Sequence, residues 1–245
     1  MVFLSHLFYF CIMEKNHTKR NIILSILFFL PVAFIIVMML TKDNYNPMDI
    51  VSKNVAELPK NDKNIQLENH ITVLSFFGDS PMDYSVAALN LKELVYDRTK
   101  GFKTFQMVTL LPYSAKEEAE QLFKKIKTYE DLRFWHFVYA SNAEIDRVFK
   151  SLKSDVKLDE SMATNAVFVI DRDKYQRGRL DDRTKKEIEG NAPIRILCSY
   201  DCIDVDDLKN KLAAEDMRVL FKEYRDKRIG KFEGSTTRRA DDLKN

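Results

Sequence analysis

The stretch ITVLSFF, Ile71–Phe77, decides the fold of this chain. It is a continuous, partly β-branched apolar run, as expected for a β-strand that is covered on both faces. Two similar runs follow it, Phe105–Leu111 (FQMVTLL) and Phe134–Tyr139 (FWHFVY). The segments between the runs, Asp83–Thr99 and Lys116–Tyr129, carry apolar residues at helical spacing. Strands that are joined through helices run parallel, with right-handed crossovers.

The pattern changes after a third helical segment, Ala143–Leu152. Val167–Ile170, a polar turn and Tyr175–Leu180 predict a β-hairpin, which adds antiparallel strands to the sheet. A long helix is predicted from Val205 to Arg228. We therefore expect an α/β domain over residues 70–229, with a mixed sheet flanked by helices, followed by a polar tail over residues 230–245.

An uncharged apolar segment, Ile22–Leu40, precedes this domain and is interrupted only by Ser25 and Pro31. At about 1.5 Å per residue, a helix of this length spans the hydrocarbon core of a bilayer. A cleaved signal peptide would have a shorter apolar stretch and a small-residue cleavage site. The sequence therefore favours one uncleaved transmembrane helix over residues 22–40.

Basic residues lie mainly on the N-terminal side of this helix, where Lys15, Lys19 and Arg20 precede it and only Lys42 follows closely. The positive-inside rule then places a short N-terminus, residues 1–21, in the cytoplasm and the large domain on the outer side. Met13 is an alternative start, because the residues before it are unusually apolar for a leader.

Residues 41–69 read as a tether between the anchor and the domain. They are rich in Asn, Asp and Lys, contain Pro47 and Pro59, and have few clustered apolar residues. The whole chain has 39 basic and 37 acidic residues, a formal charge of +2. This balance lacks the strong positive field that nucleic-acid binding requires, so that class of partner is excluded.

The loop after the first strand, Gly78–Tyr84, carries a resemblance to a known family. A strand that ends in Phe-Phe, followed by a short loop and a helix, resembles the redox or metal site of thioredoxin-like proteins. The membrane-tethered Sco copper chaperones, which assist cytochrome oxidase assembly, are similar in this respect. The hairpin NAVFVIDRDKYQRGRLDD, Asn165–Asp182, also resembles theirs, and no proline precedes it. The resemblance implies a thioredoxin-like fold over about Ile71–Arg228, in a bacterial inner membrane with a periplasmic domain.

The chain departs from that family at the residues that carry its chemistry. Ser80 stands at the position of the first cysteine, before the expected Pro81, and Tyr84 stands at the second. The position of the family's copper-binding histidine falls near Ala163. A serine hydroxyl and a phenol supply neither a reactive thiolate nor a soft ligand for Cu(I). We expect no cofactor or metal at this degenerate loop.

Helix capping also explains the loop. Ser80 suits an N-cap, Pro81 the first helical position, and Asp83 the acceptor of a capping box. Asp79 and Asp83 would favour the positive end of the helix dipole.

Cysteines and histidines give the remaining candidates. Cys198 and Cys202 share the exported domain, and their spacing allows a small disulfide, a two-sulfur metal site or two reduced thiols. Cys11 precedes the anchor, so the membrane would separate it from them. His136 lies within an aromatic run and is predicted to be a core or sheet-face residue.

Two hypotheses about function follow. The leading one is a non-catalytic, membrane-tethered Sco-like module that binds or helps to assemble a membrane partner of the respiratory-oxidase type. The alternative is a thiol-disulfide or copper-handling protein that uses Cys198 and Cys202. A peroxiredoxin-like enzyme is disfavoured, because the first loop has no cysteine.

Overall fold

The computed structural model describes residues 2–40, 47–127 and 131–230. It contains two compact units, Met1–Tyr45 and Asn46–Asn245. The first unit is one helix, α1 (Val2–Leu40). It is longer than the expected Ile22–Leu40 and includes residues predicted as a separate N-terminal segment. Neither glycine nor proline lies between Val2 and Arg20, so nothing in this stretch interrupts the helix.

The part of α1 from His17 to Met38 is long and apolar enough to cross a membrane. Its large apolar side chains are exposed, for example Leu27 (72% exposed) and Phe28 (71%). Such a surface needs an apolar environment. The expectation of one apolar N-terminal helix is therefore confirmed, whereas the side of the membrane on which the domain lies stays a prediction.

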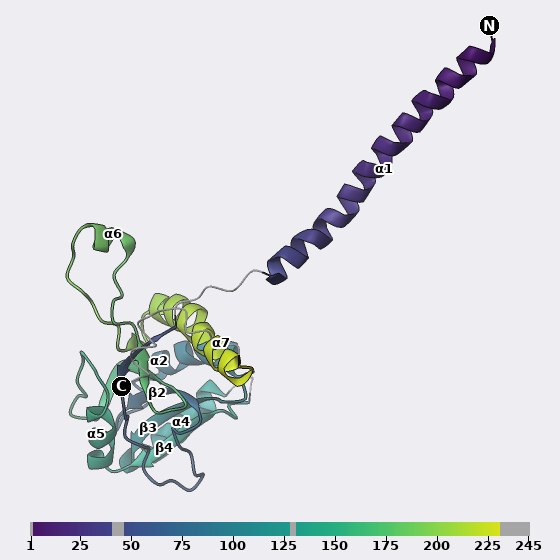
Figure 1. The fold of residues 1–245 in the computed structure, drawn as a ribbon. Helices are drawn as coiled ribbons and strands as arrows, with labels where there is room; N and C mark the ends of the chain where they lie inside the picture. The colour runs from purple at the N-terminus through teal and green to yellow at the C-terminus, as the bar shows by residue number, and fades with distance from the viewer. Residues whose placement is uncertain (1, 41–46, 128–130, 231–245) are drawn as a thin grey trace. The chain divides into compact units, whose positions relative to one another are not determined.

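The second unit is built on a seven-stranded mixed sheet (Figure 1). Six strands follow the order β1-β6-β5-β2-β3-β4, and β7 pairs with β5 off this path. The strands are β1 (Asp49–Ser52), β2 (Ile71–Phe77), β3 (Phe105–Pro112), β4 (Trp135–Ala140), β5 (Ala163–Ile170), β6 (Gln176–Gly178) and β7 (Tyr200–Asp201). β2, β3 and β4 run parallel, while β5 is antiparallel to β2 and β6 is antiparallel to β5.

Helices cover both faces of the sheet, so the core has two layers. One layer joins β2 and β3 to α2 (Ser85–Asn90), α4 (Lys116–Ile126) and α7 (Met217–Arg228). The other layer joins the opposite face to α5 (Asn142–Lys150) and to apolar residues that precede β2. The expected α/β architecture, a mixed sheet flanked by helices, is confirmed.

The expected tether is wrong for residues 47–69, which belong to the domain. β1 pairs antiparallel with β6, and Met48, Val55, Leu58 and Leu67 are buried. The Glu57 carboxylate accepts hydrogen bonds from the backbone of Leu58 (3.0 Å) and Leu67 (2.5 Å), which folds the segment back on itself. The buried residues are spaced singly among polar ones, so composition alone hides their packing. Residues 41–46 lie outside the described residues.

Two predicted helices are divided. The first consists of α2, a π-helical segment η1 (Leu91–Tyr96) and α3 (Asp97–Thr99). The last consists of a π-helical segment η3 (Asp207–Asp216) followed by α7. Two short helical segments complete the unit. η2 (Tyr113–Ala115) precedes α4, and α6 (Lys185–Glu189) lies on a loop that projects from the sheet (Figure 1).

A buried ion cluster joins three distant parts of this unit. Arg177, on β6 and 1% exposed, contacts the carboxylates of Asp171 at 2.5 Å and of Glu223 on α7 at 2.9 Å. It also donates a hydrogen bond to the carbonyl of Met48 at 2.8 Å. Burial lowers the pKa of Arg177, but the two carboxylates outweigh it and raise the pKa, so the guanidinium stays charged.

We expect Arg177→Met to lower the free energy of unfolding by about 3–5 kcal/mol, because the buried carboxylates of Asp171 and Glu223 lose the buried guanidinium, although Glu223 keeps its ion pair with Lys227 at 3.0 Å. The measurement is urea unfolding of the full chain in detergent micelles, followed by the fluorescence of Trp135, the only tryptophan.

The matched control is Lys150→Met, which removes an exposed ion pair with Asp146 (2.6 Å). This variant should change the free energy of unfolding by less than about 1 kcal/mol. Equal losses in the two variants would show that the Arg177 cluster does not hold the domain together.

Candidate functional site

The loop after β2 is held against the start of β5. Gly78 has φ +63°, and a Cβ atom there would lie 2.5 Å from the carbonyl oxygen of Ser161 and 2.8 Å from the side chain of Ala163. The N–H of Asp79 donates to that carbonyl of Ser161 at 3.0 Å. Phe77 pairs with Ala163 across the sheet. The two positions that the family resemblance singles out, the loop and Ala163, are therefore neighbours in space.

The side chains of the loop serve packing. The hydroxyl of Ser114 donates to the Asp79 carboxylate, and Pro81 is buried. Tyr84 stacks on Phe77, with ring centroids 5.4 Å apart and 16° between the ring planes. Burial, followed by the charge of Asp159, raises the pKa of Tyr84, so its phenol stays protonated at neutral pH.

The predicted capping by Ser80 is wrong. α2 begins at Ser85, its N-cap is Tyr84, and no side chain caps it. The preceding residues form a turn in which the N–H of Asp83 donates to the carbonyl of Ser80 and that of Tyr84 to the carbonyl of Pro81. In this turn, backbone carbonyls accept the hydrogen bonds of N–H groups that a capping side chain would otherwise have accepted. Ser80 itself is exposed.

Cys198 and Cys202 are both free and buried. The Cys202 thiol donates to the carbonyl of Asn165 at 2.6 Å, whereas the Cys198 thiol lies 3.6 Å from a carboxylate oxygen of Asp155. Burial, followed by the charge of Asp201, raises the pKa of Cys202 to about 12. Burial, followed by the charge of Asp155, raises the pKa of Cys198. Of the three states that the spacing allows, the structure holds two separate protonated thiols.

We expect Cys202 to alkylate at least about 100-fold more slowly in the folded chain than in urea, because the thiolate is the nucleophile and is scarce at its raised pKa. The measurement is iodoacetamide labelling at pH 8 of the full chain with Cys11→Ser, followed by mass spectrometry of the Cys202 peptide. Equal rates in the folded and unfolded chain would contradict the buried, protonated thiol.

We expect Gly78→Ala to destabilise the domain by about 1–3 kcal/mol, since its new methyl group meets backbone atoms at a positive φ. Gly101→Ala is the matched control, because a Cβ atom there meets nothing within 4 Å. Thermal unfolding of the full chain measures both changes. An unchanged midpoint for Gly78→Ala would show that the loop can move away from Ser161.

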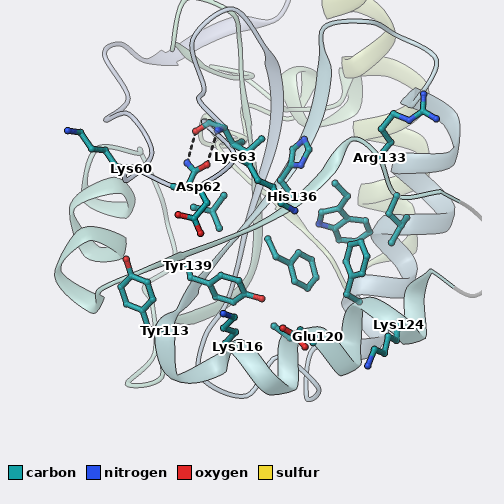
Figure 2. Close-up of a pocket in the computed structure, with 18 of the residues that line it drawn as sticks. Lys60, Asp62, Lys63, Tyr113, Lys116, Glu120, Lys124, Arg133, His136 and Tyr139 are labelled. Atoms are coloured by element: carbon teal, nitrogen blue, oxygen red, sulfur yellow. Dashed lines mark hydrogen bonds between the residues drawn. The ribbon is translucent and has the colours of Figure 1, made fainter.

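A groove that the sequence did not reveal runs along β4, with a volume of about 910 Å³. One of its walls is α4, and the other is the loop of residues 60–65 (Figure 2). His136 lines it, half-buried, as the sheet-face prediction implied. Burial, followed by the nearby charges of Lys63 and His70, lowers the pKa of His136. Among the described residues, no group of three or more His, Cys, Asp or Glu is arranged to hold a metal ion.

The sequence carried one partial signal for this groove. Aromatic side chains alternate along β4, with Trp135, Phe137 and Tyr139 on one face. This alternation does not tell whether a strand lies at the edge of a sheet or in its interior, because both kinds of strand can have it. The position of the strand depends on its pairing with distant segments. The lysines of residues 60–65 lie 70 residues away in the sequence and gave no sign that they belong to the same surface.

Comparisons with known proteins found solved structures of low similarity. No protein-family model and no curated protein sequence matches the chain. Among solved structures, it is similar to apo Sco1 from Thermus thermophilus, with 13% identity, a TM-score of 0.42, and coverage of 71% of this chain and 96% of that one. It is also similar to the soluble domain of Sco1 from Bacillus subtilis, with 14% identity, a TM-score of 0.38, and coverage of 68% and 91%.

A third similar structure is the thioredoxin domain of a thiol-disulfide oxidoreductase from Bacteroides vulgatus, with 11% identity, a TM-score of 0.32, and coverage of 61% of this chain and 96% of that one. All these identities lie below 25% and all the TM-scores below 0.5. The likeness therefore does not extend to function.

Proposed function

We propose that this chain is a non-catalytic, membrane-tethered binding module of thioredoxin-like fold. One observation carries the proposal: the loop after β2 presents Ser80 and Tyr84 where the resemblance calls for thiols. The two cysteines of the domain do not replace them, because both are buried and protonated. What remains exposed is a surface that can bind, and an apolar helix that can hold this surface beside a membrane.

The anchor and its orientation belong to the same proposal. The His17–Met38 segment crosses the inner membrane of a bacterium, and the basic residues Lys15, Lys19 and Arg20 keep the N-terminus in the cytoplasm. The domain then lies on the periplasmic side. A single span with a folded domain close behind it limits the partners to proteins that lie in or near the same membrane.

The partner that we propose is a respiratory oxidase or an assembly factor for it. The resemblance of the loop and hairpin to the Sco copper chaperones supports this choice. In this role the domain would hold or position an assembling subunit, and it would pass on neither copper nor electrons. The alternative, thiol or copper chemistry at Cys198 and Cys202, would need both residues to leave their buried positions.

The test is complementation of a deletion in the host bacterium. We expect the deletion to reduce the amount of assembled oxidase, measured from haem absorbance and oxygen consumption. A chain with Cys198→Ser and Cys202→Ala should restore oxidase to the wild-type level, because no thiol takes part.

Two results would overturn the proposal. The first is a chain with Cys198→Ser and Cys202→Ala that is present at wild-type abundance, checked by immunoblot, yet does not restore the oxidase. The second is tight, stoichiometric Cu(I) binding by the purified full chain with Cys11, Cys198 and Cys202 all replaced, which would reveal a metal site elsewhere.

A further inference from the structure

The outer edge of β4 is open. β4 ends the strand order, and it pairs in parallel with β3, where the N–H of Met107 donates to the carbonyl of Phe134 at 2.8 Å. In a parallel ladder the backbone groups of alternate residues point to opposite sides. Those of Phe137 and Tyr139 therefore point away from β3. Among the described residues, no other strand pairs with this edge.

The groove along this edge has two different walls. On one side, α4 contributes Ala119 and Phe123, and the ring of Phe123 meets that of Phe137 edge-on with centroids 5.5 Å apart. On the other side lies the loop of residues 60–65, with Lys60 and Lys63. Figure 2 shows Tyr139, Lys116, Glu120 and Lys124 toward the α4 side, and Lys60, Asp62 and Lys63 across the groove from them.

The loop wall is preformed. The side-chain amide of Asn61 donates to the carbonyls of Pro59 (3.0 Å) and Ile65 (2.8 Å), and its oxygen accepts from the N–H of Ile65 at 2.8 Å. Figure 2 draws bonds of this clamp as dashed lines. A wall held in this way loses little conformational entropy when a ligand enters, so binding is less costly.

The charge of the lining is unbalanced. Arg133 and Asp131 pair with each other at 3.1 Å and so largely cancel. The other charged residues that line the groove are four lysines and two carboxylates: Lys60, Lys63, Lys116 and Lys124, against Asp62 and Glu120. The groove therefore has a positive potential above an apolar, aromatic floor.

We propose that this groove binds an extended acidic segment of a protein partner, which adds to the sheet as a strand along β4. Apolar side chains of the segment face α4 and Phe123, and acidic ones face Lys60 and Lys63. Backbone groups of Phe137 and Tyr139 supply the hydrogen bonds, as in β-strand addition. This inference rests on the proposed function as a binding module and names the surface and the kind of partner.

Charge favours this occupant over a second copy of the chain. Two copies paired edge to edge along β4 would bring the lysines of both grooves together, and like charges across an interface oppose association. An acidic segment meets complementary charge instead. A cationic segment would be rejected for the same reason as a second copy.

The test uses the full chain in nanodiscs of phosphatidylcholine, which has no net charge. The probe is a fluorescein-labelled ten-residue peptide of alternating aspartate and valine, and its fluorescence anisotropy reports binding. We expect saturable binding that weakens as salt is raised. Lys60→Glu with Lys63→Glu should weaken it about tenfold or more, and an alternating lysine–valine peptide should not bind.

Lys185→Glu with Lys186→Glu is the matched control, since it makes the same change of net charge at exposed positions on α6. Two N-methylated peptides test the backbone pairing. Methylating only the aspartate amides or only the valine amides blocks opposite edges of the strand, so one peptide should lose binding and the other should keep it.

Three results would overturn the inference: no binding of the acidic peptide, equal loss in the two lysine variants, or equal binding of the two N-methylated peptides. Self-association through β4, detected as a dimer that the Lys60 and Lys63 changes disrupt, would also overturn it. The proposed function is judged separately. A chain with Lys60→Glu and Lys63→Glu that restores the oxidase fully shows that the groove inference fails while the binding module stands.

Discussion

The buried guanidinium of Arg177 is the interaction on which the rest of the domain depends. Taking this charge out of water is costly, and two carboxylates and one carbonyl offset the cost only when three distant segments meet around it. β6, α7 and the segment before β1 are fixed in this way. The β5–β6 hairpin then positions β5. β5 in turn positions Gly78 beside Ser161, and it provides both the Asn165 carbonyl that accepts from the Cys202 thiol and the pairing partner of β7.

The central strands and the fold class could be predicted from the sequence, because strands that are covered on both faces are mainly apolar, as Ile71–Phe77 is apart from Thr72 and Ser75. β1 could not be predicted, since half-buried residues at a sheet edge leave a polar composition. The π-helical segments were hidden for another reason: one extra residue per turn leaves the apolar spacing nearly helical. The absence of thiols at the loop could be read directly from the sequence. The groove could not, because Lys63 and β4, which line it together, are far apart in the chain.

The loop after β2 is part of the packing of the domain. Tyr84 extends the aromatic core by stacking on Phe77, and the Asp79 carboxylate takes the Ser114 hydroxyl. The N–H of Met82 donates to Glu118 on α4 at 3.1 Å. These contacts hold the loop within the domain. A cysteine introduced at Ser80 alone would meet no second metal ligand at Ala163, which lies beside the loop.

The lysines of the groove can also be understood as protection against aggregation, since an open strand edge invites pairing and charge discourages it. Protective lysines usually lie on the edge strand itself. β4 has no lysine, arginine or carboxylate, and its histidine, His136, is neutral at neutral pH because its pKa is lowered. The lysines lie on the walls instead, where they leave the backbone edge accessible. A basic strand is repelled there and a neutral strand gains hydrogen bonds alone, while an acidic strand gains attraction and hydrogen bonds together. The same lysines thus protect the edge against aggregation and recognise an acidic strand. The edge of β4 can therefore stay open, because it favours one kind of strand.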